Sequence, residues 1–159
     1  MIIVTENVYK KIIKKEGQIT MKEIGILNAD ISNAISRMGH MDEIMVIDAG
    51  FPIPLGVNTI DLSLAINKPT VVEVLDELLK YFSVEKIILA NETKKISPSM
   101  FDNVIGKFDK SVAVETIPHT ELKQRSKSVK AIIRTGDFTA NTNVLLVSAG
   151  GPRWYCEKG

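Results

Sequence analysis

The sequence predicts an α/β fold, a single domain with a largely parallel sheet flanked by helices. Short apolar runs of the kind that form buried strands alternate along the chain with stretches whose apolar residues recur at helical spacing. The length of 159 residues suits one domain with its own hydrophobic core. Because ligands of such sheets bind at strand ends, polar residues at those positions are the first candidates for function.

The N-terminal third of the chain contains one expected helix and one expected strand. Residues 1–20 are interpreted as an extension that precedes the domain. Residues 28–38 predict a short helix with one apolar face, and both Asn28 and Asp30 suit its N-cap. Residues 43–47 are continuously apolar after Glu43 and predict a buried strand, which leads into a proline-rich loop at 50–58.

The remaining elements follow the same alternation. Asp61 either holds the preceding loop or begins a helix. Helices are expected at 71–82, 99–108 and 120–126, and strands at 86–90, 112–117, 130–135 and 143–147. A polar turn at 136–142 joins the last two strands.

Composition excludes several classes of function. The formal net charge of +1 gives no reason to expect nucleic acid or an anionic membrane as a partner, and no apolar run approaches the roughly 20 residues that span a bilayer. The single cysteine, Cys156, fits a reducing compartment, so we expect a cytoplasmic protein. Phosphate-binding glycine motifs and metal-ligand spacings are both lacking, which predicts that no cofactor and no metal is used.

Two titratable residues flank the strand expected at 43–47. His40 precedes it and is either a general acid or base or a solvated loop histidine, because imidazole exchanges protons near neutral pH. Asp48 follows the strand and either binds a hydroxyl group or supports the following loop as an Asx-turn residue.

Further polar residues occupy other strand ends. His119 follows one strand, and Asn141, Thr142 and Asn143 precede the last. Alternatively, each of these residues is an ordinary helix-cap or turn residue with no part in function. Together with His40 and Asp48 they predict a cofactor-free pocket suited to proton transfer on a small, neutral, polar ligand.

Several of these segments resemble the D-ribose pyranases. The resemblance covers residues 21–149 and is most specific in Gly39-His40-Met41-Asp42 and in Asp48-Ala49-Gly50-Phe51-Pro52-Ile53-Pro54. It continues through Ile60-Asp61-Leu62, Ala90-Asn91-Glu92, Ile117-Pro118-His119 and Ile133-Arg134-Thr135-Gly136. The L-fucose mutarotases are a sister group that is less similar in the proline-rich loop.

The resemblance implies an isomerase that interconverts the cyclic forms of a free aldose, D-ribose first, through ring opening. It assigns His40 as proton donor and places Asp48, His119 and the segment Asn141-Thr142-Asn143 against the sugar. It implies no cofactor, and it implies a ring of subunits, commonly a decamer, with sites near subunit contacts. We expect an unphosphorylated sugar, because no cluster of arginine or lysine accompanies the candidate residues.

The chain also departs from the pyranase pattern. Asn141 stands where the family has tyrosine, Thr59 stands where arginine is frequent, and the tail at 150–159 differs from the usual ending. The loss of the tyrosine keeps a second hypothesis open, a catalytically weak sugar-binding or regulatory protein. Two alternatives stay open for the altered tail: Trp154 or Tyr155 replaces the lost aromatic wall, for example on a neighbouring subunit, or the tail is disordered.

Overall fold

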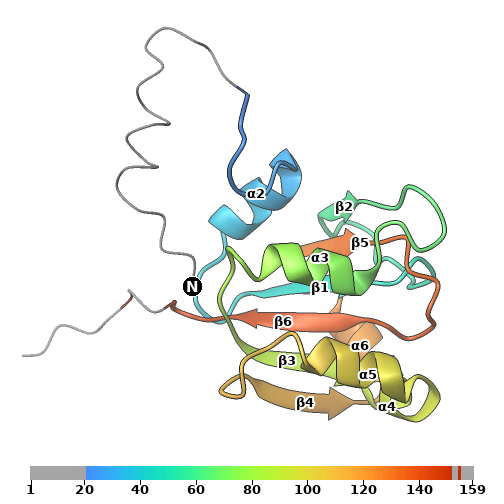
Figure 1. Cartoon of the computed structure of the whole chain (residues 1–159). Coiled ribbons are helices and arrows are strands. Elements are labelled where there is room, and N and C mark those ends of the chain that lie inside the picture. The colour runs from blue at the N-terminus through green and yellow to red at the C-terminus, as the bar shows by residue number, and fades with distance from the viewer. Residues whose placement is uncertain (1–20, 152–153, 155–159) are drawn as a thin grey trace, which may run out of the picture.

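A computed structural model describes residues 21–151 and Trp154 of the chain. The expected extension at 1–20 and most of the tail at 150–159 lie outside these described residues. The described part is one mixed six-stranded sheet with helices on both faces (Figure 1). The predicted fold class is therefore confirmed.

The sheet has the strand order β2-β5-β1-β6-β3-β4. Parallel pairing joins β1 to β5, β2 to β5, and β3 to β4, whereas β6 runs antiparallel to both of its neighbours. The strands are β1 (Glu43–Ile47), β2 (Thr59–Asp61), β3 (Val84–Ala90), β4 (Ala113–Ile117), β5 (Ala131–Arg134) and β6 (Val144–Ser148). β5 and β6 are consecutive along the chain, yet β1 separates them in the sheet.

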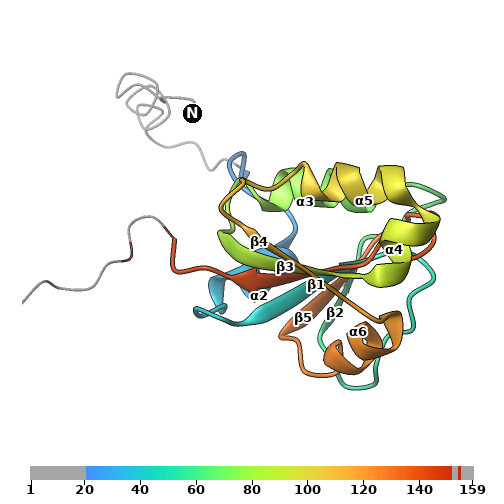
Figure 2. The same cartoon turned by 90° about the horizontal axis from the view of Figure 1, so that it is seen from below.

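Helices cover the two faces unequally. α2 (Ala29–Ser36), α3 (Val71–Leu78) and α5 (Pro98–Ile105) contribute to one hydrophobic core, and α6 (His119–Arg125) contributes Leu122 to a second core on the opposite face. Figure 2 shows α3 and α5 on one side of the sheet and α6 on the other. The central strands are apolar on both faces because helices cover both.

Local signals explain where the helices begin. Asn28 caps α2 by accepting a hydrogen bond from the Ile31 amide, which selects one of the two candidate caps. Thr70 and Glu73 form a reciprocal capping box at the start of α3. Both helices end earlier than their apolar periodicity predicts, at Ser36 and Leu78.

The structure contains two elements that sequence analysis did not predict, β2 and α4 (Asn91–Ile96). β2 has three residues, of which only Ile60 is buried, so it carries too little apolar signal to be found in the sequence. Asp61 ends this strand and does not begin a helix. α4 fills the segment between β3 and Pro98, and Pro98 begins α5.

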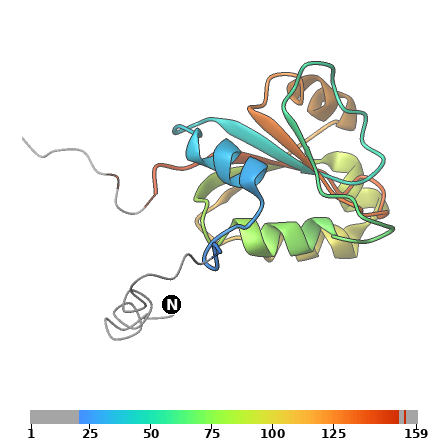
Figure 3. The same cartoon turned by 90° about the horizontal axis from the view of Figure 1, so that it is seen from above.

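Strand direction defines two ends of the sheet. β1 begins, and β6 ends, at the end beside α2 and the exit of the chain towards Trp154 (Figures 1 and 3). At the other end β1 finishes, β6 begins, and α6 starts. Asp48 and Asn143 therefore lie together at one end, whereas His40 lies at the opposite end of β1.

Candidate functional site

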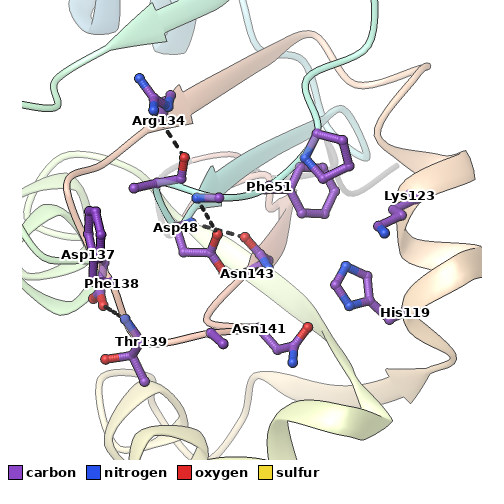
Figure 4. Close-up of a pocket in the computed structure, with 14 residues that line it drawn as sticks. Asp48, Phe51, His119, Lys123, Arg134, Asp137, Phe138, Thr139, Asn141 and Asn143 are labelled. Carbon is purple, nitrogen blue, oxygen red and sulfur yellow. Dashed lines mark hydrogen bonds between the residues drawn. The ribbon is translucent and has the colours of Figure 1, made fainter.

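A cavity of about 380 Å³ opens at the end of the sheet where β1 finishes (Figure 4). It is bordered by the loop after β1, the first turns of α6 and the segment between β5 and β6. Its walls include four of the predicted site residues, Asp48, His119, Asn141 and Asn143. Four of the residues that sequence analysis grouped in one pocket thus lie around one cavity, whereas His40 and Thr142 do not.

Asp48 and Asn143 form a reciprocal pair at the base of the cavity. The Asp48 amide donates to Asn143 Oδ1 at 2.9 Å, and Asn143 Nδ2 donates to Asp48 Oδ2 at 3.0 Å. The second carboxylate oxygen of Asp48 accepts from the Gly50 amide at 2.9 Å. Both side chains are buried, so the pair has one fixed geometry before any ligand arrives.

His119 forms a second wall at the first position of α6. Its backbone amide donates to Glu92 Oε2 at 2.9 Å, and its ring stacks on Phe51 with centroids 5.9 Å apart and an interplanar angle of 8°. Within the described residues Nε2 of the ring is buried without a hydrogen-bond partner. A buried nitrogen in this state is placed to bind a ligand hydroxyl.

Glu92 positions His119 through the helix terminus. Hydrogen bonds to its own amide and to the His119 amide lower the pKa of Glu92. A carboxylate at this position also complements the partial positive charge of a helix N-terminus. The negative charge of Glu92 therefore favours the observed start of α6.

The segment between β5 and β6 is fixed by a buried carboxylate. Asp137 accepts hydrogen bonds from the Val71 amide at 3.0 Å and from the Thr139 amide at 2.8 Å, so it links the cavity wall to the start of α3. Asn141 adopts a left-handed backbone conformation with φ 64°, which asparagine tolerates better than most residues. Its carbonyl accepts from Thr93 Oγ1 at 2.5 Å, which fixes the turn beside the cavity.

Thr142 does not line the cavity. It is 1% exposed, and its hydroxyl has no hydrogen-bond partner within the described residues. The Thr142 side chain therefore lies in the interior, while its neighbours on both sides border the cavity.

His40 lies outside the cavity, before β1. Its Nε2 is 2.8 Å from Glu85 Oε2, and its ring lies 5.1 Å from that of Trp154. The five residues of β1 extend over about 16 Å, which is farther than a side chain can reach. One copy of the chain therefore does not bring His40 and Asp48 together.

Sequence reasoning did not single out the two basic residues of the cavity as site residues. Lys123 and Arg134 both line it, although sequence analysis expected no cluster of arginine or lysine beside the candidate residues. Lys123 is four residues after His119 on the same helix, a spacing that places both on one face and could have revealed it. Arg134 donates hydrogen bonds to Asp61 Oδ2 at 2.8 Å and to the Ala49 carbonyl at 3.0 Å. Its side chain therefore supports the loop after β1.

Comparisons with known proteins agree with this architecture. Residues 21–150 match the RbsD / FucU transport protein family. The chain belongs to this family. Within residues 21–151 and 154, no helix is long and apolar enough to cross a membrane.

Curated relatives connect the chain to one enzyme. The D-ribose pyranase of Pseudothermotoga lettingae is 41% identical over 138 residues, which cover 87% of this chain and 97% of that protein. The D-ribose pyranase of Thermotoga maritima is 46% identical over 130 residues, which cover 80% and 96% respectively. By homology the chain is an isomerase of the D-ribose pyranase type.

A solved structure extends the comparison to the fold. The structure of Bacillus subtilis RbsD complexed with D-ribose has a TM-score of 0.77 and 36% sequence identity to this chain. The match covers 81% of this chain and 98% of the Bacillus subtilis protein. The two proteins therefore share the same α/β fold.

Proposed function

We propose that this protein interconverts the pyranose and furanose forms of free D-ribose by opening and reclosing the sugar ring. The observation that carries the proposal is the buried Asp48–Asn143 pair, which borders a cavity together with His119 and Lys123. Similarity to D-ribose pyranases and to a relative bound to D-ribose supports the choice of sugar.

The chemistry requires two proton movements. A proton leaves the anomeric hydroxyl and another reaches the ring oxygen, so the bond between that oxygen and the anomeric carbon breaks and an open-chain aldehyde forms. Attack on the aldehyde by a different hydroxyl closes the alternative ring. Asp48 and Asn143 hold the sugar hydroxyls, and the unpartnered nitrogen of His119 binds another.

We assign the proton delivered to the ring oxygen to His40 of a second copy of the chain. Within one copy His40 is separated from the cavity by the length of β1. Phe138 in the cavity wall is exposed, and so are Leu64 and Ile66 in the loop after β2, which Asn67 joins to the Phe138 amide by a hydrogen bond. Exposed apolar side chains of this kind can be covered by a protein partner. A ring of subunits brings one copy's His40 to another copy's cavity.

The competing assignment gives the proton transfer to His119, which needs no second copy. A subunit-mixing experiment separates the two. If His40 of a second copy is the proton donor, the His40→Ala and Asp48→Ala proteins are each inactive alone. If His119 is the donor, the His40→Ala protein stays active. The two variant proteins are then dissociated, mixed in equal amounts and reassembled. In roughly a quarter of the sites formed between two subunits, an intact His40 then meets an intact Asp48.

The measurement is saturation-transfer NMR on free sugars, with D-ribose, L-fucose, D-galactose and ribose 5-phosphate compared. We expect faster exchange between ribose ring forms at catalytic protein concentration, and recovery of activity in the mixed assembly. Preference for ribose 5-phosphate would instead assign Lys123 to a phosphate. Exchange that no sugar accelerates would favour the sugar-binding hypothesis.

A further inference from the structure

Three side chains from separate segments meet where β1 begins. His40 comes from the turn before β1, Glu85 from the start of β3, and Trp154 from the chain beyond β6. We call them the His40 cluster. The His40 and Trp154 rings are tilted by 55° with centroids 5.1 Å apart, and the carboxylate of Glu85 lies 2.8 Å from His40 Nε2.

The Trp154 ring packs against the backbone of Gly150. A Cβ atom placed on Gly150 would lie 1.9 Å from Trp154 Cε3, so only glycine leaves room for the ring at this point. The Trp154 amide also donates to the Gly151 carbonyl at 3.2 Å. Gly150 and Gly151 therefore accommodate the ring in its place beside His40.

The His40 cluster presents an uncovered aromatic face. Trp154 is 66% exposed, and the His40 side chain is 40% exposed. An exposed aromatic ring beside a group that can transfer protons is available to contact a ligand or a partner.

The cavity at the other end of the sheet has one exposed aromatic ring in its wall, that of Phe138, which is 63% exposed. Position 141 carries asparagine, and the Phe51 ring is already stacked on His119. Sugar sites combine polar groups for the hydroxyls with an apolar surface for the carbon-bound hydrogens. The His40 cluster carries a further exposed aromatic ring, that of Trp154, directly beside the group proposed to transfer the proton.

We propose that Trp154 is a sugar-contacting residue that enters the cavity of a second copy together with His40 and packs against the aldose ring. The inference rests on the proposed function, because it uses the same pairing of His40 with a second copy's Asp48. Any ligand that His40 reaches lies beside Trp154, since the two rings are in contact. Trp154 thereby takes the role of an aromatic wall supplied between subunits.

The chain contains a single tryptophan, so its fluorescence reports on Trp154 alone. Titration of the full-length protein with D-ribose is expected to change the emission and to protect Trp154 from quenching by acrylamide. Asp48→Ala, which damages the cavity, is expected to abolish both effects although it is distant from Trp154 within one copy. A residue with a purely structural role would show neither response.

Variants provide the second measurement. Trp154→Ala is expected to raise KM for ribose about 10-fold with a smaller change in kcat, and Trp154→Phe to restore most of the loss. Tyr81→Ala, which removes another exposed aromatic side chain away from the cavity, is the matched control and should leave KM unchanged.

The outcomes separate this inference from the proposed function. Accelerated ribose exchange with an unresponsive Trp154 and an unchanged KM in Trp154→Ala would overturn the inference and leave the function standing. Emission that responds to ribose without any exchange would support the contact and reject the enzyme function. If neither responds, both are rejected.

Discussion

The two ends of the sheet hold their polar groups in different ways. At the cavity end, Asp48 and Asn143 are buried and satisfy one another through reciprocal hydrogen bonds. At the other end, His40 and Glu85 are partly exposed and share one contact of 2.8 Å. We propose that the cavity end is a preformed binding half, and that the open His40 cluster acts on a second copy of the chain.

This contrast predicts that mutations at the two ends have different effects on stability and activity. Loss of a buried, reciprocally bonded group costs folding free energy as well as binding. Loss of an exposed group leaves the fold intact and removes only chemistry. The following predictions test that separation.

The largest effect is expected for His40→Ala. The rate of ribose exchange should fall about 10²–10⁴-fold, which is the usual contribution of a general acid or base, while ribose binding largely survives. The free energy of unfolding should change by less than about 0.5 kcal/mol, because His40 is on the surface. NMR exchange and urea denaturation measure the two quantities.

His40→Gln is the matched control, since its amide can still contact Glu85 but cannot transfer a proton at neutral pH. It should be as inactive as His40→Ala. Near-full activity in either variant would contradict the assignment and make His119 the proton donor.

Asp48→Ala is expected to affect both stability and binding. It leaves Asn143 Nδ2 buried without an acceptor, at a cost of about 1–3 kcal/mol in the free energy of unfolding. Ribose binding should be lost in isothermal titration. If Asp48→Ala unfolds at the same urea concentration as the wild type, the cavity end is not the rigid half described above.

Thr142→Val tests a residue that the sequence assigned to the sugar. The hydroxyl of Thr142 is buried without a partner, so an isosteric methyl group should leave stability unchanged or raise it by up to about 1 kcal/mol. Ribose KM should not change. A rise in KM would show that the hydroxyl contacts the sugar after all.

The smallest effect is expected for Glu92→Gln, and it should depend on pH. The pKa of Glu92 is lowered in the folded protein, so its stabilising contribution is present above the ordinary glutamate pKa and is lost as pH falls through the lower folded value. The variant should be less stable than the wild type at pH 7, and the difference should shrink at pH 3. Urea denaturation at both values measures it, and a constant difference would exclude a role for the charge.

The sequence by itself determined the fold class and the elements with strong patterns. The apolar run at 43–47 became β1 with the predicted bounds, and Asn28 capped α2 because its side chain meets the free amides of the first turn. The pyranase resemblance was confirmed, because its motifs are local and keep their order along the chain. The placement of Asp48, His119, Asn141 and Asn143 around one cavity followed from their positions at strand ends.

Only the tertiary structure decided what those residues meet. β6 pairs between β1 and β3 and not beside β5, and this pairing brings Asn143 to Asp48 across 95 positions of sequence. Lys123 reaches the cavity because α6 packs on the face of the sheet beside it. His40 and Asp48 are only eight residues apart in the sequence, yet β1 separates them in space. Periodicity reports which face of an element is buried, but strand order and the partners of polar groups depend on long-range pairing, which leaves no local signal.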